Sequence, residues 1–149
     1  MKKYLIFFGI PAVLLLLFFS FYSAFKNSSG PPDPNAPTLE LPSTQGPPVT
    51  VNNFLKSPAQ NLSYGAVIVE TADYKIIYFS EDEGIIITLK STPLGYAQVE
   101  AEGELLVKLG ISRTQACNLK VFITVPMDVS AEAAGKSYPM SFCTGGKVL

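Results

Sequence analysis

The stretch GIIITLKSTPLGYAQVEAEGELLVKLGISRTQACNLKVFITV, residues 84–125, decides the fold of this chain. Its first seven residues alternate in the manner of a β-strand: Ile85, Ile87 and Leu89 share one face, and Ile86 and Thr88 share the other. The first of these faces is the more apolar. Another element of the fold is therefore expected to cover it.

The covering element is expected directly downstream, as an amphipathic helix over residues 93–109. Its apolar residues recur at steps of three and four and form one stripe: Leu94, Ala97, Ala101, Leu105 and Leu109. We expect Thr92 to cap this helix and Pro93 to be its first residue, where the missing N–H has no cost. Gly110 supplies the stop.

A second strand is predicted over residues 119–125, where Leu119, Val121, Ile123 and Val125 share one face. Upstream, residues 65–71, 74–80 and 84–90 are separated by short turns and predict an antiparallel meander. Residues 49–54 and 138–142 are expected to add short strands, with a loop or one helical turn at 128–135. The sequence thus predicts an α+β fold, a small and mostly antiparallel sheet packed by one main helix.

Outside this domain, the N-terminus has the pattern of a membrane anchor. Tyr4–Phe25 contains no charged residue, and a helix of that length spans the roughly 30 Å of a hydrocarbon core. We expect residues 1–26 to be an uncleaved signal-anchor helix that contacts the lipid bilayer; a cleaved signal peptide is the alternative. Two lysines, Lys2 and Lys3, precede the apolar run, and only Lys26 follows it directly. This excess of positive charge predicts the N-terminus inside and the C-terminal domain outside the cytoplasmic membrane.

The anchor and the domain are joined by a segment rich in proline. Residues 27–48 contain seven of the chain's 12 prolines and only two sizeable apolar residues, Leu39 and Leu41. Such a segment cannot bury enough surface to offset its ordering entropy, so we expect a disordered, semi-rigid stalk. A proline-rich ligand for a partner domain is the alternative. The globular domain is then expected over residues 49–149.

Cys117 and Cys143 are the only cysteines, and both fall in the part predicted to lie outside. An even number in a small exported domain predicts one disulfide. Closing a loop of about 26 residues would stabilise the domain by roughly 3.5 kcal/mol in the chain-entropy treatment. A redox-active pair or a nucleophilic thiol is the alternative, although the spacing is not C-x-x-C.

The segments LGISRTQACNL (109–119) and VPMDVSAEAAGKSYPMSFC (125–143) resemble a group of uncharacterised, membrane-anchored short proteins of candidate-phyla (Patescibacteria-type) bacteria. These proteins are similar in their anchor, their proline-rich stalk, an opening like VNNFLKSP (51–58) and an AG…SFC ending. The resemblance covers residues 49–145. It implies the same topology and paired cysteines, and it implies no catalytic residue because the group has no assigned activity.

Composition excludes several classes of function. The chain has 149 residues, a net charge of −1 and no histidine. It therefore lacks a basic footprint for nucleic acid and has no Ser-His-Asp or Cys-His nucleophile system or imidazole zinc ligand. Residues 81–83, Glu-Asp-Glu, fit a solvated hairpin tip better than a calcium loop. We identify no catalytic, cofactor-binding or metal-binding residue.

Five tyrosines are numerous for so small a domain: Tyr64, Tyr74, Tyr78, Tyr96 and Tyr138. Most are expected at the edges of the core, and a ring cluster that binds a peptide or a glycan is the alternative. The expected function is a non-catalytic binding or structural module at the cell envelope, whose partner is an envelope protein or a glycan. An accessory subunit of a membrane complex and a histidine-independent envelope enzyme are the alternatives.

Overall fold

The computed structural model describes residues 35–149, which belong to one compact unit. The predicted anchor and residues 27–34 of the predicted stalk lie outside the described residues. In chain order the described elements are β1 (Thr38–Leu41), β2 (Val49–Asn52), the 3-10 helix η1 (Phe54–Lys56), β3 (Gln60–Leu62), β4 (Gly65–Glu70), β5 (Tyr74–Phe79), β6 (Gly84–Leu89), α2 (Leu94–Leu109), α3 (Arg113–Ala116) and β7 (Val121–Thr124). None of the helices between residues 35 and 149 is long and apolar enough to cross a bilayer.

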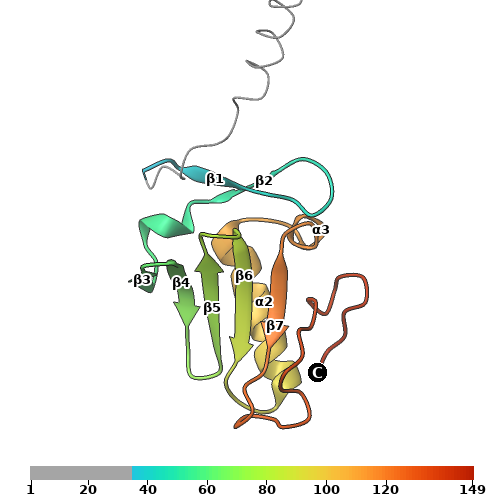
Figure 1. Ribbon diagram of the computed structural model, residues 1–149. Helices are drawn as coiled ribbons and strands as arrows, with labels where there is room; N and C mark the ends of the chain where they lie inside the picture. The colour runs from blue at the N-terminus through green and yellow to red at the C-terminus, as the bar shows by residue number, and fades with distance from the viewer. Residues whose placement is uncertain (1–34) are drawn as a thin grey trace, which may run out of the picture. The chain divides into compact units, whose positions relative to one another are not determined.

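The main sheet has five strands in the order β3-β4-β5-β6-β7 (Figure 1). The strands from β3 to β6 pair antiparallel with their neighbours, which confirms the predicted meander. β7 pairs parallel with β6, with Ile85 opposite Val121. A parallel pair requires a crossover connection, and α2 provides it. The prediction of a mostly antiparallel sheet with one main helix is confirmed.

The helix α2 ends as predicted but begins differently. Gly110 is its C-cap, with φ 65°, a left-handed conformation that favours glycine. At the other end Pro93 is the N-cap, in an extended conformation and without a side-chain capping bond. The expectation that Thr92 caps the helix is therefore wrong. Since no side-chain cap is present, the burial of the apolar stripe of the helix carries most of its stability.

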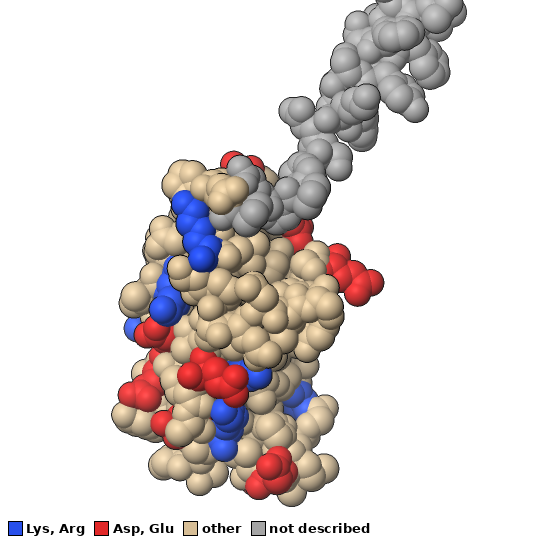
Figure 2. Space-filling view, turned by 90° about the vertical axis from the view of Figure 1, so that its left-hand side faces the viewer, with Lys and Arg blue, Asp and Glu red and all other residues tan. Residues whose placement is uncertain are grey.

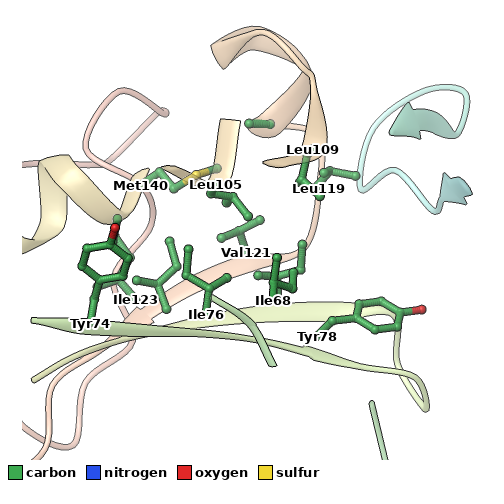
Figure 3. Packing of buried hydrophobic residues seen from close by; sticks show 14 of the residues in the cluster. Ile68, Tyr74, Ile76, Tyr78, Leu105, Leu109, Leu119, Val121, Ile123 and Met140 are labelled. Carbon is green, nitrogen blue, oxygen red and sulfur yellow. The ribbon is translucent and has the colours of Figure 1, made fainter. Parts of the chain in front are cut away.

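The core lies between the sheet and α2. Figure 3 shows Tyr74, Ile76 and Tyr78 rising from the sheet on the side where Leu105 and Leu109 lie. Ile76, Leu105 and Leu109 are fully buried, and all five belong to one hydrophobic cluster. The alternation in the quoted stretch is confirmed too, since its apolar-face residues are buried: Ile85, Ile87, Leu89, Val121 and Ile123.

The structured part of the chain begins earlier than the predicted boundary at residue 49. Leu39 and Leu41 lie on β1, which pairs antiparallel with β2 as a separate two-stranded sheet. Both leucines are buried in the main core, and the loop after β1 is tied down by two hydrogen bonds from Thr44 to the carbonyl oxygen of Asn118, at 2.6 and 3.0 Å. The expectation of a disordered stalk is therefore wrong for residues 38–41. These residues form a strand because β1 pairs with β2 and the side chains of Leu39 and Leu41 pack into the core.

The predicted last strand, residues 138–142, is reduced to a single bridge. Tyr138 exchanges two backbone hydrogen bonds with Ile123, at 2.8 and 2.9 Å, and no further pairing follows. Pro139 cannot donate to a ladder, which explains why pairing stops there. The turn expected before β7 contains α3, which a capping box between Ser112 and Gln115 begins.

Two buried polar side chains of α2 hold the C-terminal segment against the helix. Gln98 donates to the carbonyl oxygen of Lys147 at 3.0 Å and accepts from the N–H of Leu149 at 2.9 Å. Glu102 accepts from the backbone N–H of Ser141 at 2.6 Å and from its hydroxyl at 2.5 Å. Because all four are satisfied hydrogen bonds, the burial of these polar groups is compatible with a stable fold.

Candidate functional site

The two faces of the five-stranded sheet differ in what covers them. α2 packs on the face that carries Ile76 and Ile87, and Figure 1 shows this helix behind the strands. The opposite face carries a cross-strand row of Ile77, Ile86 and Phe122. Phe122 remains 41% exposed. No helix of residues 35–149 packs on this face, which we call the uncovered face. An apolar row there is unusual for an antiparallel sheet, in which the solvent side is commonly polar.

A groove of about 890 Å³ runs over this uncovered face. Its apolar lining comes from Tyr64, Phe79, Ile86 and Phe122, and its charged lining from Glu81, Asp82 and Lys120. We call it the aromatic groove. Its volume lies within the range of small-ligand and side-chain pockets, and its lining combines apolar surface with a few charges, as such pockets do.

Gly84 explains why the face is hollow at this point. It pairs with Phe79 across the β5–β6 ladder and contributes no side chain between Phe79 and the neighbouring strand β7. A Cβ atom at this position would lie 3.2 Å from Oδ1 of Asp82 and 3.4 Å from Cδ of Lys120. The glycine thus leaves room both for the groove and for the ion pair of Asp82 and Lys120.

Two aromatic rings form one wall of the groove. Tyr64, in the turn between β3 and β4, stacks on Phe79 of β5 with ring centroids 5.6 Å apart and an interplanar angle of 16°. Tyr64 is 52% exposed, so much of this stacked pair is in contact with solvent. A planar, rigid aromatic surface of this kind offers contact area at a small cost in side-chain entropy.

An ion pair lies at one end of the groove. Nζ of Lys120 lies 2.5 Å from Oδ2 of Asp82, and the other carboxylate oxygen accepts from the N–H of Gly84 at 3.2 Å. The hydrogen bond from Lys120 lowers the pKa of Asp82 below its ordinary value. Within residues 35–149, Glu81 forms no ion pair. The lining therefore has two carboxylates and one ammonium group.

A second, smaller hollow of about 320 Å³ has Lys120 and Phe122 among its lining residues, as the aromatic groove does. It lies at the outer edge of β7, between Val121 and the segment that contains Pro139 and Met140. This is the place where the pairing of β7 with the Tyr138 segment stops. We call it the edge hollow. The two hollows together flank β7 on its uncovered face and along its edge.

The five tyrosines do not form one cluster. Tyr74 and Tyr78 are buried in the core, whereas Tyr96 is exposed on α2 and donates to Glu100. Tyr138 is packed against the core, so only Tyr64 lines the aromatic groove. The hypothesis of a tyrosine cluster is thus wrong. The other aromatic residues of the groove, Phe79 and Phe122, were missed by the sequence analysis. The signal for both was their position among the outward-facing residues of a strand.

The remaining sequence predictions concern the cysteines and the acidic turn. Cys117 and Cys143 form the predicted disulfide. Residues 81–83 form the turn between β5 and β6, as expected for a hairpin tip. No group of three or more side chains in the described part of the chain is placed to hold a metal ion.

On one face of the molecule the surface charges are mixed rather than gathered by sign. On the face shown in Figure 2, basic and acidic side chains lie beside one another among a majority of other residues. Glu70, for example, contacts both Lys75 and Lys90, at 3.1 and 3.2 Å. No family model, no curated protein and no solved structure matches this chain.

Proposed function

We propose that this chain is a non-catalytic binding module, displayed outside the cytoplasmic membrane on an N-terminal anchor. The observation that carries the proposal is the aromatic groove, an exposed apolar surface with a charged end on the uncovered face of the sheet. Exposed apolar surface lowers the stability of a domain in water, and larger patches of it mark interaction sites. A binding role explains why the row of Ile77, Ile86 and Phe122 on this face is apolar.

The location outside the membrane is supported by the bonded cysteines. A structural disulfide between Cys117 and Cys143 persists in oxidising compartments and is rare in the cytosol. The proposed anchor is supported by the uncharged run Tyr4–Phe25, and its proposed orientation is supported by the lysines that flank this run.

Site-specific photo-cross-linking in intact native cells tests the binding role. A benzophenone amino acid replaces Phe122 in the groove, and in a matched variant it replaces Val107, which is 72% exposed on α2. We expect discrete adducts from position 122 and none above background from position 107. Equal labelling from both positions, or none from position 122, would refute the proposal. A single adduct with an integral membrane protein at fixed stoichiometry would indicate an accessory subunit of a membrane complex.

A further inference from the structure

We propose that the aromatic groove binds an arginine side chain of another envelope protein, whose guanidinium group stacks on the exposed rings of the groove and pairs with Glu81. This inference rests on the proposed binding function and names the chemistry of the ligand. Three features of the structure support it: rings on both sides of the groove, a carboxylate without an ion-pair partner at its end, and the place of the chain's own arginine.

Aromatic rings lie on both sides of the groove. Tyr64 and Phe79 stack on the β5 side, Phe122 belongs to β7, and Ile86 of β6 lies between them. Because neighbouring strands are about 4.8 Å apart, the backbones of β5 and β7 are about 9.6 Å apart, and one bound side chain can reach both walls. A guanidinium group is planar and binds ring faces by stacking and by cation–π attraction.

The carboxylates at the end of the groove outnumber the cations there. Glu81 and Asp82 are both lining residues, and the single lining cation, Lys120, is already paired with Asp82. Within residues 35–149, Glu81 forms no ion pair. A neutral or acidic ligand beside Glu81 would displace water from its carboxylate without replacing the lost hydrogen bonds, whereas a guanidinium group donates up to two N–H bonds to it.

The arginine is expected to come from another protein rather than from a second copy of this chain. Arg113 is the only arginine in the sequence. It lies on α3, away from the lining of the groove, and its guanidinium carbon is 5.3 Å from the centre of the Phe142 ring. A second copy would have to break this contact to supply the side chain, which favours a different partner.

Four probes are tested on the full chain in micelles of an uncharged detergent. The first is N-acetyl-arginine amide, and the second is its citrulline analogue, which has the same shape but a neutral urea group. The third is N-acetyl-lysine amide, and the fourth is the trimer of N-acetylglucosamine. Binding is followed by the backbone amide resonances of Gly84 and Phe122 in the groove, with Val107 on α2 as the reference.

We expect the arginine probe to shift the resonances of Gly84 and Phe122 and not that of Val107. The citrulline probe should bind about tenfold more weakly, since it loses one exposed cation–π contact and one exposed ion pair. The lysine probe should fall between the two, because it has the charge without the planar group. Added salt should weaken the arginine probe more than the citrulline probe.

Three variants at exposed positions assign the effect to single side chains. Glu81→Gln should reduce the difference between the arginine and citrulline probes to about threefold, the share of the cation–π contact. Glu132→Gln removes the same charge outside the groove and should preserve the full difference. Phe122→Leu keeps an apolar residue but removes a ring, so it should weaken the arginine probe. Equal melting temperatures of the variants show that their folds are intact.

Equal affinities for arginine and citrulline, or a difference that Glu81→Gln leaves unchanged, would overturn the inference. So would the absence of shifts at Gly84 and Phe122 up to the solubility limit of the arginine probe, or tighter binding of the sugar trimer.

The photo-cross-linking experiment separates this inference from the proposed binding function. In intact cells, the adduct from position 122 should map to a partner peptide that contains an arginine. An adduct with a glycan or with a peptide that lacks arginine would overturn the inference and leave the proposed binding function standing. The absence of any adduct from position 122 would overturn both.

Discussion

The Cys117–Cys143 disulfide allows the sharpest prediction on stability. It closes a loop of 26 residues, for which the chain-entropy relation gives a stabilisation of about 3.5 kcal/mol at 25 °C. A folded unit of about 115 residues has an unfolding entropy of about 0.24 kcal/mol/K, at roughly 2.1 cal/mol/K per residue. Loss of the bond should therefore lower the melting temperature by about 14 °C.

The structure also predicts where the reduced protein opens first. Cys143 lies in the segment that Gln98 and Glu102 hold against α2, and this segment has no regular secondary structure of its own. Without the covalent bond, these hydrogen bonds, the burial of Met140, the bridge at Tyr138 and the contact of Phe142 with Arg113 retain it. Amide hydrogen exchange should therefore accelerate in residues 141–149 before it does in β5 and β6.

The assay is thermal unfolding of the full chain in detergent, followed by circular dichroism with and without a phosphine reductant. The variant Cys117→Ala/Cys143→Ala is the control, because it should melt at the temperature of the reduced protein and should not respond to the reductant. Both cysteines are only partly buried, so the alanine substitutions add little cavity cost. A fall of less than about 3 °C, or a response of the variant to reductant, would refute the reasoning.

Three further predictions concern single side chains. Gly103→Ala should stabilise α2 by up to about 1 kcal/mol, because a Cβ atom at this position meets nothing within 4 Å. Gly95→Ala should not stabilise the helix, because its Cβ atom would lie 2.8 Å from the side chain of Val148. Urea unfolding of both variants separates the two cases. Tyr78→Phe should be neutral or stabilising by about 1 kcal/mol, since the buried hydroxyl of Tyr78 has no hydrogen-bond partner among residues 35–149. A loss of more than about 1 kcal/mol in the same assay would contradict this. Because the pKa of Asp82 is lowered in the folded state, its contribution to stability is present above its unfolded pKa and is lost as the pH falls through its folded pKa. Asp82→Asn should therefore reduce the fall of the melting temperature at acid pH. An unchanged fall would show that the pair with Lys120 contributes nothing measurable to stability.

Much of the fold could be predicted from local patterns. The meander, the helix with its glycine stop and the strand β7 each follow from periodicity and turn residues within one short segment. β1 could not be predicted in this way, because Leu39 and Leu41 stand among prolines and are buried only when β2 and the core are present. Thr92 was expected to cap α2, but the cap position belongs to Pro93.

The candidate site was less accessible to sequence reasoning than the fold. Phe79 and Phe122 are 43 residues apart in the sequence and line one groove only because β5 and β7 flank β6. The tyrosine count pointed to Tyr64 but also to residues that are buried in the core. Gly84 was visible in the sequence, yet its role as a gap beside Phe79 depends on the β5–β6 register.

The sequence by itself determined the types of the main elements, the faces of the strands and the pairing of the cysteines, because each depends on local spacing, backbone preference or a count of two thiols. Only the tertiary structure decided which face of the sheet remains uncovered and that β7 pairs parallel with β6. It also decided that Gln98 and Glu102 are buried, since the backbone and hydroxyl groups that bond to them belong to residues about 40 to 50 positions away. Long-range contacts of this kind depend on how separate segments pack, which no local pattern specifies.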